Sequence, residues 1–125
     1  MLSHAEQEKY LISRVGNPVN FKYPEGEGKK KGKLVDRVVC FSSENEKVVY
    51  WNLIDLIRFE NEDEDRLRIT YYRYRKRENE WNFAGQTSLT DPYSNIVNLF
   101  TRAVREKDWI RPLFKKVYEQ CRDVL

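Results

Sequence analysis

The sequence predicts a single α+β domain over residues 1–125, in which an antiparallel sheet of about five strands carries helices at both ends. Residues 1–16 hold helix start and stop signals, residues 17–90 hold short apolar runs with a period of two, and residues 91–125 return to helical spacing. A chain of this length buries about two thirds of its surface on folding, which is enough for one hydrophobic core.

Helix signals define the N-terminal segment, residues 1–16. Ser3 and Glu6 have the spacing of a capping box, in which each side chain bonds the backbone N–H of the other residue. Gly16 supplies the positive φ that often ends a helix, and Pro18 prevents the helix from continuing. We therefore expect a helix that ends before residue 17.

The middle of the chain, residues 17–90, is predicted to form the sheet. The expected strands cover residues 19–23, 33–41, 47–51, 53–59, 66–76 and 81–89. Polar turns at residues 42–46 and 77–80 are short, and short turns make neighbouring strands antiparallel.

The C-terminal part, residues 91–125, is predicted to form two helices. Asp91 followed by Pro92 is a strong helix start, because the carboxylate caps the first turn and proline needs no N–H there. Asp108 is expected to cap the second helix, with Pro112 in its first turn. We expect both helices to pack on one face of the sheet.

Composition narrows the range of functions. The formal net charge of +3 is weak evidence for nucleic-acid binding, and no apolar run approaches the roughly 20 residues of a membrane helix. One histidine and two isolated cysteines offer almost no metal-ligand set, so we expect no metal and no cofactor. With no secretory signal, we expect reduced cysteines and a cytoplasmic protein without membrane contact.

The basic strand at residues 66–77 is the main candidate binding surface. It interleaves cations with rings through Tyr72, Arg73, Tyr74 and Arg75, and Trp81 lies on the return strand. Tyrosine, tryptophan and arginine dominate interaction hot spots. The pattern favours a small non-catalytic module that binds a protein or a small molecule on the sheet face away from the helices. Strand alternation prevents all five residues from sharing one face unless a bulge intervenes.

The same strand supports an alternative function, the binding of single-stranded nucleic acid. Arginine pairs with phosphates and tyrosine stacks on bases, although no familiar RNA-binding signature accompanies this strand. Gln86, with the polar residues that follow it, either lines a small pocket at a strand end or faces water.

A second alternative is a small enzyme that uses Asp36 or Asp55 as general acid or base. Each carboxylate lies in an apolar segment, and burial without a partner raises a carboxyl pKa toward the range useful in catalysis. The structural interpretation is that each carboxylate points outward or pairs with Arg37, Arg58 or a tyrosine hydroxyl. A homodimer is also expected, because an aromatic-rich sheet with an open edge favours self-association.

Four segments resemble a group of small uncharacterised prokaryotic proteins, some carried on mobile gene cassettes such as those of integrons. The segments are YWNLIDLIRFE at 50–60, YYR at 71–73, WNFAGQTSLT at 81–90 and EKDW at 106–109. The resemblance implies a prokaryotic source. Because no activity is known for that group, it implies no catalytic residue.

Overall fold

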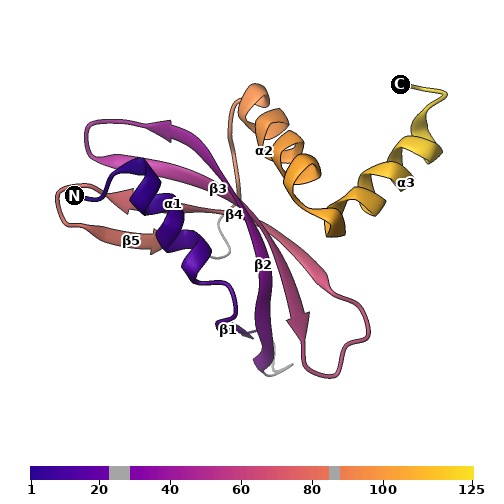
Figure 1. Ribbon diagram of the computed structural model, residues 1–125, viewed down its shortest axis with the longest axis horizontal. Coiled ribbons are helices and arrows are strands. Elements are labelled where there is room, and N and C mark those ends of the chain that lie inside the picture. The colour runs from indigo at the N-terminus through magenta and orange to yellow at the C-terminus, as the bar shows by residue number, and fades with distance from the viewer. Residues whose placement is uncertain (23–28, 85–87) are drawn as a thin grey trace.

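The computed structural model describes residues 1–22, 29–84 and 88–125, and its architecture is α+β as the sequence predicts (Figure 1). One antiparallel sheet has the strand order β1-β2-β3-β4-β5. The strands are β1 (Pro18–Lys22), β2 (Lys29–Glu44), β3 (Val48–Phe59), β4 (Arg66–Arg75) and β5 (Glu80–Phe83). The helices are α1 (His4–Ser13), α2 (Tyr93–Glu106) and α3 (Arg111–Cys121), with a 3-10 turn, η1 (Asp108–Ile110), between the last two.

Helix α1 begins and ends where the local signals predict. The Ser3 hydroxyl accepts the Glu6 N–H at 3.2 Å, and the Glu6 carboxylate accepts the Ser3 N–H at 2.9 Å. Gly16 has a φ of +97°, a backbone conformation that residues other than glycine rarely adopt. The capping box and the glycine stop are therefore both confirmed.

Strand β3 is one continuous strand through Asn52, where the sequence predicts two separate strands. Asn52 lies between the predicted strands at 47–51 and 53–59, yet it pairs with Cys40 on β2 and Tyr71 on β4. Only 2% of Asn52 is exposed. Its side chain finds a hydrogen-bond partner in the fold, so a polar residue does not interrupt the strand.

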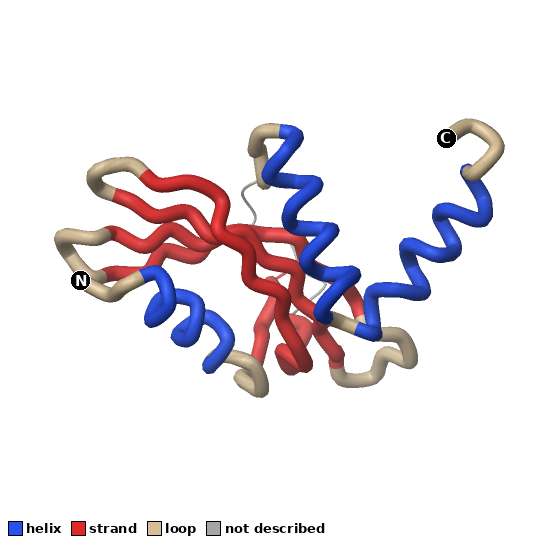
Figure 2. The backbone as a smooth tube through the Cα atoms, turned by 45° about the horizontal axis from the view of Figure 1, so that its top comes forward, coloured by secondary structure: helices blue, strands red, loops and turns tan. Residues whose placement is uncertain are grey.

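The sheet carries a helix on each of its two faces (Figures 1 and 2). On the first, the α1 face, Leu11 of α1 packs into a buried cluster. The cluster contains Leu11, Val39, Val49, Trp51, Leu53 and Tyr74. On the second, the α2 face, a separate cluster joins the sheet to α2 and η1. That cluster contains Val38, Cys40, Ile54, Leu99, Ala103 and Ile110. Neighbours such as Val38 and Val39 separate because side chains alternate along a strand.

Of the two C-terminal helices, α2 covers the sheet and α3 turns away from it (Figure 1). Asp36 on β2 accepts hydrogen bonds from Lys107 at 3.0 Å and from the Trp109 indole at 2.8 Å. These bonds hold the turn before α3 on the sheet. Phe114 is the hydrophobic residue of α3 that packs on the α2-face cluster in the described part of the chain, and none of the eleven residues of α3 is buried.

Candidate functional site

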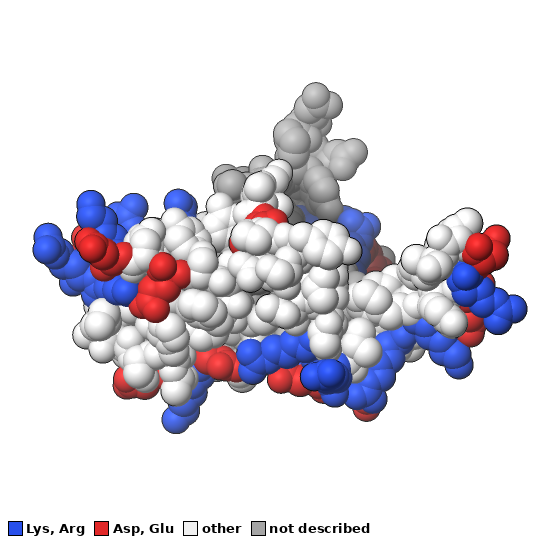
Figure 3. Space-filling view, turned by 90° about the horizontal axis from the view of Figure 1, so that it is seen from above, with Lys and Arg blue, Asp and Glu red and all other residues white. Residues whose placement is uncertain are grey.

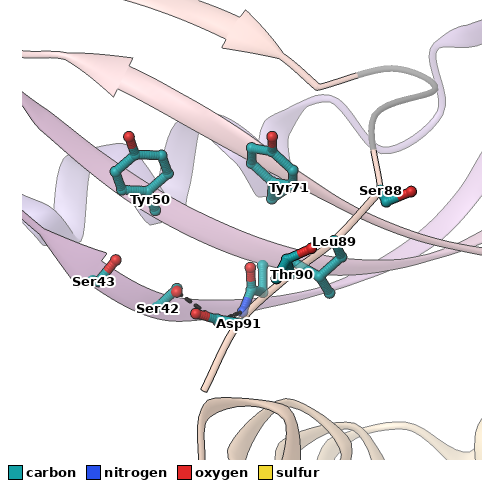
Figure 4. Close-up of a pocket in the computed structure, with 9 residues that line it drawn as sticks. Ser42, Ser43, Tyr50, Tyr71, Ser88, Leu89, Thr90 and Asp91 are labelled. Carbon is teal, nitrogen blue, oxygen red and sulfur yellow. Dashed lines mark hydrogen bonds between the residues drawn. The ribbon is translucent and has the colours of Figure 1, made fainter. Parts of the chain in front are cut away.

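A pocket of about 370 Å³ opens on the α2 face beside the start of α2 (Figure 4). Strands β2, β3 and β4 and the segment before α2 contribute to its wall. Its described lining residues are Ser42, Ser43, Tyr50, Asn52, Tyr71, Ser88, Leu89, Thr90 and Asp91. We call it the Asp91 pocket, because Asp91 is the charged side chain among these residues.

Asp91 is held in place by neutral donors. Its Oδ2 accepts hydrogen bonds from the Ser42 hydroxyl at 2.7 Å and the Asn52 amide at 2.6 Å. Its Oδ1 accepts from the Asn95 amide at 3.2 Å. The ion pairs among the described residues do not include Asp91. A carboxylate accepts about four hydrogen bonds, so the three donors among the described residues leave roughly one acceptor position for a ligand.

This arrangement corrects the predicted role of Asp91 as a helix cap. The N-cap of α2 is Pro92, and no side chain of the described residues accepts a cap hydrogen bond from a backbone N–H of the first turn. The Asp91 carboxylate is directed to Ser42 and Asn52 on the sheet instead, as the dashed lines in Figure 4 show. Tertiary donors therefore compete successfully with the local cap.

A β-bulge brings Ser42 to the pocket. Phe41 pairs with Trp51 and Ser43 pairs with Tyr50, so Ser42 is the extra residue on β2. A bulge bends its strand and redirects the inserted side chain. The bulge is thus the local device that places a hydroxyl against Asp91.

Two tyrosine rings form the other wall of the pocket. Tyr50 on β3 and Tyr71 on β4 are half-buried, and their ring centroids lie 6.5 Å apart with a tilt of 48°. Figure 4 shows the rings side by side with their hydroxyls pointing the same way. The pocket therefore combines flat apolar surface with hydroxyl groups and one carboxylate.

The aromatic residues singled out in the sequence lie on the α1 face, away from this pocket. Tyr74 is fully buried, and its hydroxyl accepts the Leu2 N–H at 2.8 Å. Trp81 is half-buried with its ring 4.9 Å from that of Tyr74, and Tyr72 packs against the same cluster. The expectation that these rings lie on a helix-free face is wrong, because α1 covers this face.

Arg73 and Arg75, the two arginines of the predicted binding surface, lie on the α2 face. Arg73 pairs with Tyr50 on one side and with Asn82 on the other, and Arg75 is exposed near the end of β4. The Nε of Arg73 and the Oδ1 of Asn82 are buried without a hydrogen-bond partner in the described part of the chain. Arg73 is thus the predicted residue that adjoins the tyrosines of the Asp91 pocket. Gln86 lies outside the described residues.

Asp55 is the centre of a buried ion cluster on the α1 face. It accepts hydrogen bonds from Arg37 at 2.6 and 3.1 Å and from Arg68 at 2.8 Å. Arg37 also donates to the Leu11 carbonyl at 3.0 Å, which ties the cluster to α1. Burial alone would lower the pKa of Arg37, but hydrogen bonding and charge from Asp55 raise it above its ordinary value. The pairing of Asp55 with Arg37 is confirmed, and burial without a partner is wrong.

Asp36 lies on the opposite face from Asp55, so the two carboxylates do not meet. Burial alone would raise the pKa of Asp36, but hydrogen bonds from Trp109, the Arg37 N–H and Lys107 lower it below its ordinary value. The raised pKa expected for a general acid is therefore wrong for this residue.

Comparisons with known proteins leave the Asp91 pocket to be interpreted from its own geometry. No protein-family model, curated protein or solved structure matches this chain. Across residues 1–22, 29–84 and 88–125, no three His, Cys, Asp or Glu side chains group as metal ligands. Within the same ranges, no helix is long and apolar enough to cross a membrane.

Sequence reasoning missed most residues of the Asp91 pocket. The polar run after Phe83 was the one indication of a small pocket, and Ser88 of that run does line it. Asn52, the lone amide in an apolar strand, is the signal that points most directly to the site. Tyr50 and Tyr71 carry no local signal, because rings at alternate strand positions more often belong to a core.

Proposed function

We propose that this protein is a non-catalytic binding protein that takes a small polar ring compound into the Asp91 pocket. The observation that carries the proposal is a carboxylate with no basic partner among the described residues, placed opposite two tyrosine rings in a pocket of about 370 Å³. Ligand pockets typically have about 300–1,000 Å³ and a few convergent polar groups.

Recognition divides between the two walls of the pocket. An N–H or O–H of the ligand donates to the remaining acceptor position of Asp91, and a hydrogen bond to a charged group contributes about 1.5–3 kcal/mol. The ligand ring packs on Tyr50 and Tyr71, while the lining hydroxyls of Ser43, Ser88 and Thr90 donate or accept as needed. Amino-substituted rings and polyhydroxylated rings share this chemistry.

The test is a titration followed by backbone amide NMR, with benzylamine as the amine probe and glucose as the polyhydroxylated probe. We expect at least one probe to bind with a dissociation constant of about 1 mM or lower, equivalent to about 4 kcal/mol. The shifts should be concentrated at residues 42–43, 50–52 and 88–91. The absence of saturable shifts with both probes would overturn the proposal.

Variants separate the two walls. Asp91→Asn should weaken the amine probe about tenfold, since the variant loses the charge and keeps the shape. Tyr71→Leu should weaken both probes, because each loses a ring surface. Asp63→Asn, at an exposed carboxylate between β3 and β4, is the matched control and should bind like the original protein. If the Asp91→Asn and Asp63→Asn variants bind the amine probe with equal affinity, the Asp91 carboxylate does not contribute to ligand binding.

A further inference from the structure

A second cavity, of about 190 Å³, opens on the α1 face, between the end of α1, the start of β1 and strands β2, β4 and β5. Its described walls include three arginines, Arg14, Arg37 and Arg68, and no acidic residue. We call this cavity the arginine pocket. A water molecule takes about 30 Å³ in the liquid, so the pocket has room for a group of phosphate size.

Arg37 and Arg68 are held in the wall of the arginine pocket by Asp55. This carboxylate is fully buried, bonds both guanidinium groups and is not itself part of the described wall. The Arg37 guanidinium has five N–H donors, and its bonds to Asp55 and to the Leu11 carbonyl use three of them. A buried and fixed cation therefore keeps donor capacity at the pocket.

Two aromatic rings orient the same guanidinium groups. Arg37 lies over the ring of Tyr72 at 5.5 Å, and Arg68 lies over the ring of Phe83 at 4.8 Å. The two rings are themselves in contact, with centroids 4.9 Å apart. A guanidinium that turns its face to a ring keeps the N–H donors at its edge for an anion. Both rings line the pocket, so apolar surface lies next to the cations.

The turn from α1 into β1 forms the rim of the arginine pocket (Figure 1). Two backbone hydrogen bonds tie this turn to β2, because the Gly16 N–H donates to the Leu34 carbonyl at 2.7 Å and the Leu34 N–H donates to the Asn17 carbonyl at 3.0 Å. Arg14 and Asn17 are exposed at this rim. Arg14 enters none of the ion pairs among the described residues, so it adds a third positive charge to the pocket.

The charge of the arginine pocket matches a phosphate group. Its three arginines carry three positive charges, and Asp55, which bonds two of them, carries one negative charge, so these described groups have a net charge of two. A phosphate monoester carries about −1.5 to −2 at neutral pH, whereas a carboxylate carries a single negative charge. Arginine also pairs with two phosphate oxygens at once, which fixes the orientation of the group.

Basic side chains do not cover the molecule evenly. Figure 3, viewed from the end where α2 begins, shows a broad central area without Lys or Arg. Three arginines around one cavity of about 190 Å³ are therefore a local concentration of charge. Like charges at such close range repel one another, and a bound anion relieves that repulsion.

We propose that the arginine pocket binds the phosphate group of a small organic molecule. Arg14 and Arg37 donate hydrogen bonds to the phosphate oxygens, Arg68 adds its charge, and the exposed amide of Asn17 adds a donor at the rim. The organic part of the ligand packs against the two rings of the wall. This site lies on the opposite face of the sheet from the Asp91 pocket, and the proposal is independent of ligand binding there.

The first test is a backbone amide NMR titration with inorganic phosphate, phenyl phosphate and acetate at neutral pH and constant ionic strength. We expect phenyl phosphate to bind with a dissociation constant of about 1 mM or lower, and inorganic phosphate to bind more weakly because it has no ring. Acetate should bind at least about tenfold more weakly than phenyl phosphate. The shifts should be concentrated at residues 14–20, 37, 68 and 72. The absence of saturable shifts with both phosphates, or an equal affinity for acetate, would overturn the proposal. Tighter binding of inorganic phosphate than of phenyl phosphate would contradict an organic ligand.

A pair of variants separates the pocket from the general positive charge of the chain. Arg14→Gln should weaken phenyl phosphate about tenfold, and the fold should persist because Arg14 is exposed. Arg122→Gln, at an exposed position after α3, removes the same charge and should bind like the original protein. If the two variants bind phenyl phosphate equally, net charge accounts for the binding and the proposal is wrong.

A second measurement needs no variant. A ligand that binds the folded chain raises the midpoint of thermal unfolding as its concentration exceeds the dissociation constant. We expect phenyl phosphate at about twenty times its dissociation constant to raise the midpoint of the original protein by about 5 °C, relative to chloride at the same ionic strength. An unchanged midpoint would contradict binding to the folded chain.

Discussion

At the residue scale, the buried cluster of Arg37, Asp55 and Arg68 is the most consequential interaction in the sheet. Asp55 is fully buried, and the side chain of Arg37 is only 2% exposed. Removing one partner from such a cluster leaves an uncompensated charge in the interior. We predict that Asp55→Asn lowers the free energy of unfolding by about 3–5 kcal/mol, measured by urea denaturation.

The matched control for that substitution is Asp63→Asn, which should change stability by less than about 0.5 kcal/mol because it is an exposed surface position. A cost below about 1 kcal/mol for Asp55→Asn would show that the two arginines do not depend on this carboxylate.

Asp36 gives the structure a pH dependence with a defined sign. Its pKa is lowered in the folded state by Trp109, the Arg37 N–H and Lys107, despite partial burial. A lowered folded-state pKa contributes stability above the unfolded value of about 3.9, and that contribution is lost as the pH falls through the folded value.

We therefore predict that the original protein is more stable than the Asp36→Asn variant, and that this difference in stability is largest at neutral pH. The difference should shrink below about pH 4. Thermal unfolding of both proteins across this range measures it, and a difference that grows with acidity would reverse the assigned sign.

A single bulge explains why the sequence indicated these carboxylates and named Arg37 among their possible partners, but did not specify which carboxylate Arg37 pairs with. Leu34 pairs with Ile57, and after the bulge Asp36 pairs with Leu56 and Arg37 with Asp55. If residue 35 were paired with Leu56 in continuous register, Asp36 would lie opposite Asp55 and the two carboxylates would repel each other. A one-residue shift in register exchanges the faces of all later side chains, and no local pattern specifies such a shift here.

At the element scale, α1 depends on its capping box. Ser3→Ala removes the side chain that accepts the Glu6 N–H, and we predict a loss of about 1 kcal/mol in the free energy of unfolding. Ser94→Ala, at an exposed position in α2, is the control and should be close to neutral. If chemical denaturation gives the same change in the free energy of unfolding for Ser3→Ala and Ser94→Ala, the capping box contributes nothing beyond helix propensity.

Elements with local signals were predictable, and elements decided by distant contacts were not. The cap at Ser3 and the stop at Gly16 are local, so α1 follows from the sequence. The start of α2 differs by one residue because Asp91 bonds the sheet, and β3 continues through Asn52 because Asp91 accepts its amide. The same carboxylate, which sequence reasoning assigned to a helix cap, explains both differences.

At the scale of the whole molecule, the sheet separates two independent clusters. Leu11 belongs to the α1-face cluster and Leu99 to the α2-face cluster. Leu11→Val and Leu99→Val each remove about one methylene, worth about 1 kcal/mol. We predict that the double variant loses the sum of the two within about 0.5 kcal/mol, as distant sites without shared partners do. A larger deviation in denaturation experiments would mean that the faces are coupled through the sheet.

The fold class was predictable because the periodicities of strands and helices differ along the chain. The side of the sheet that each helix takes was not, since every strand offers apolar residues to both faces. The Asp91 pocket exists only where a bulge, a buried amide and the segment before α2 converge from positions 42, 52 and 91. Such convergence is a property of the assembled sheet.

A crystal structure of the protein soaked with benzylamine is the decisive experiment for ligand binding in the Asp91 pocket. We predict that the probe lies in this pocket, with its amine within hydrogen-bond distance of the Asp91 carboxylate and its ring against Tyr50 and Tyr71. A probe bound only elsewhere, with the Asp91 pocket holding solvent at saturating concentration, would show that this pocket is not the binding site.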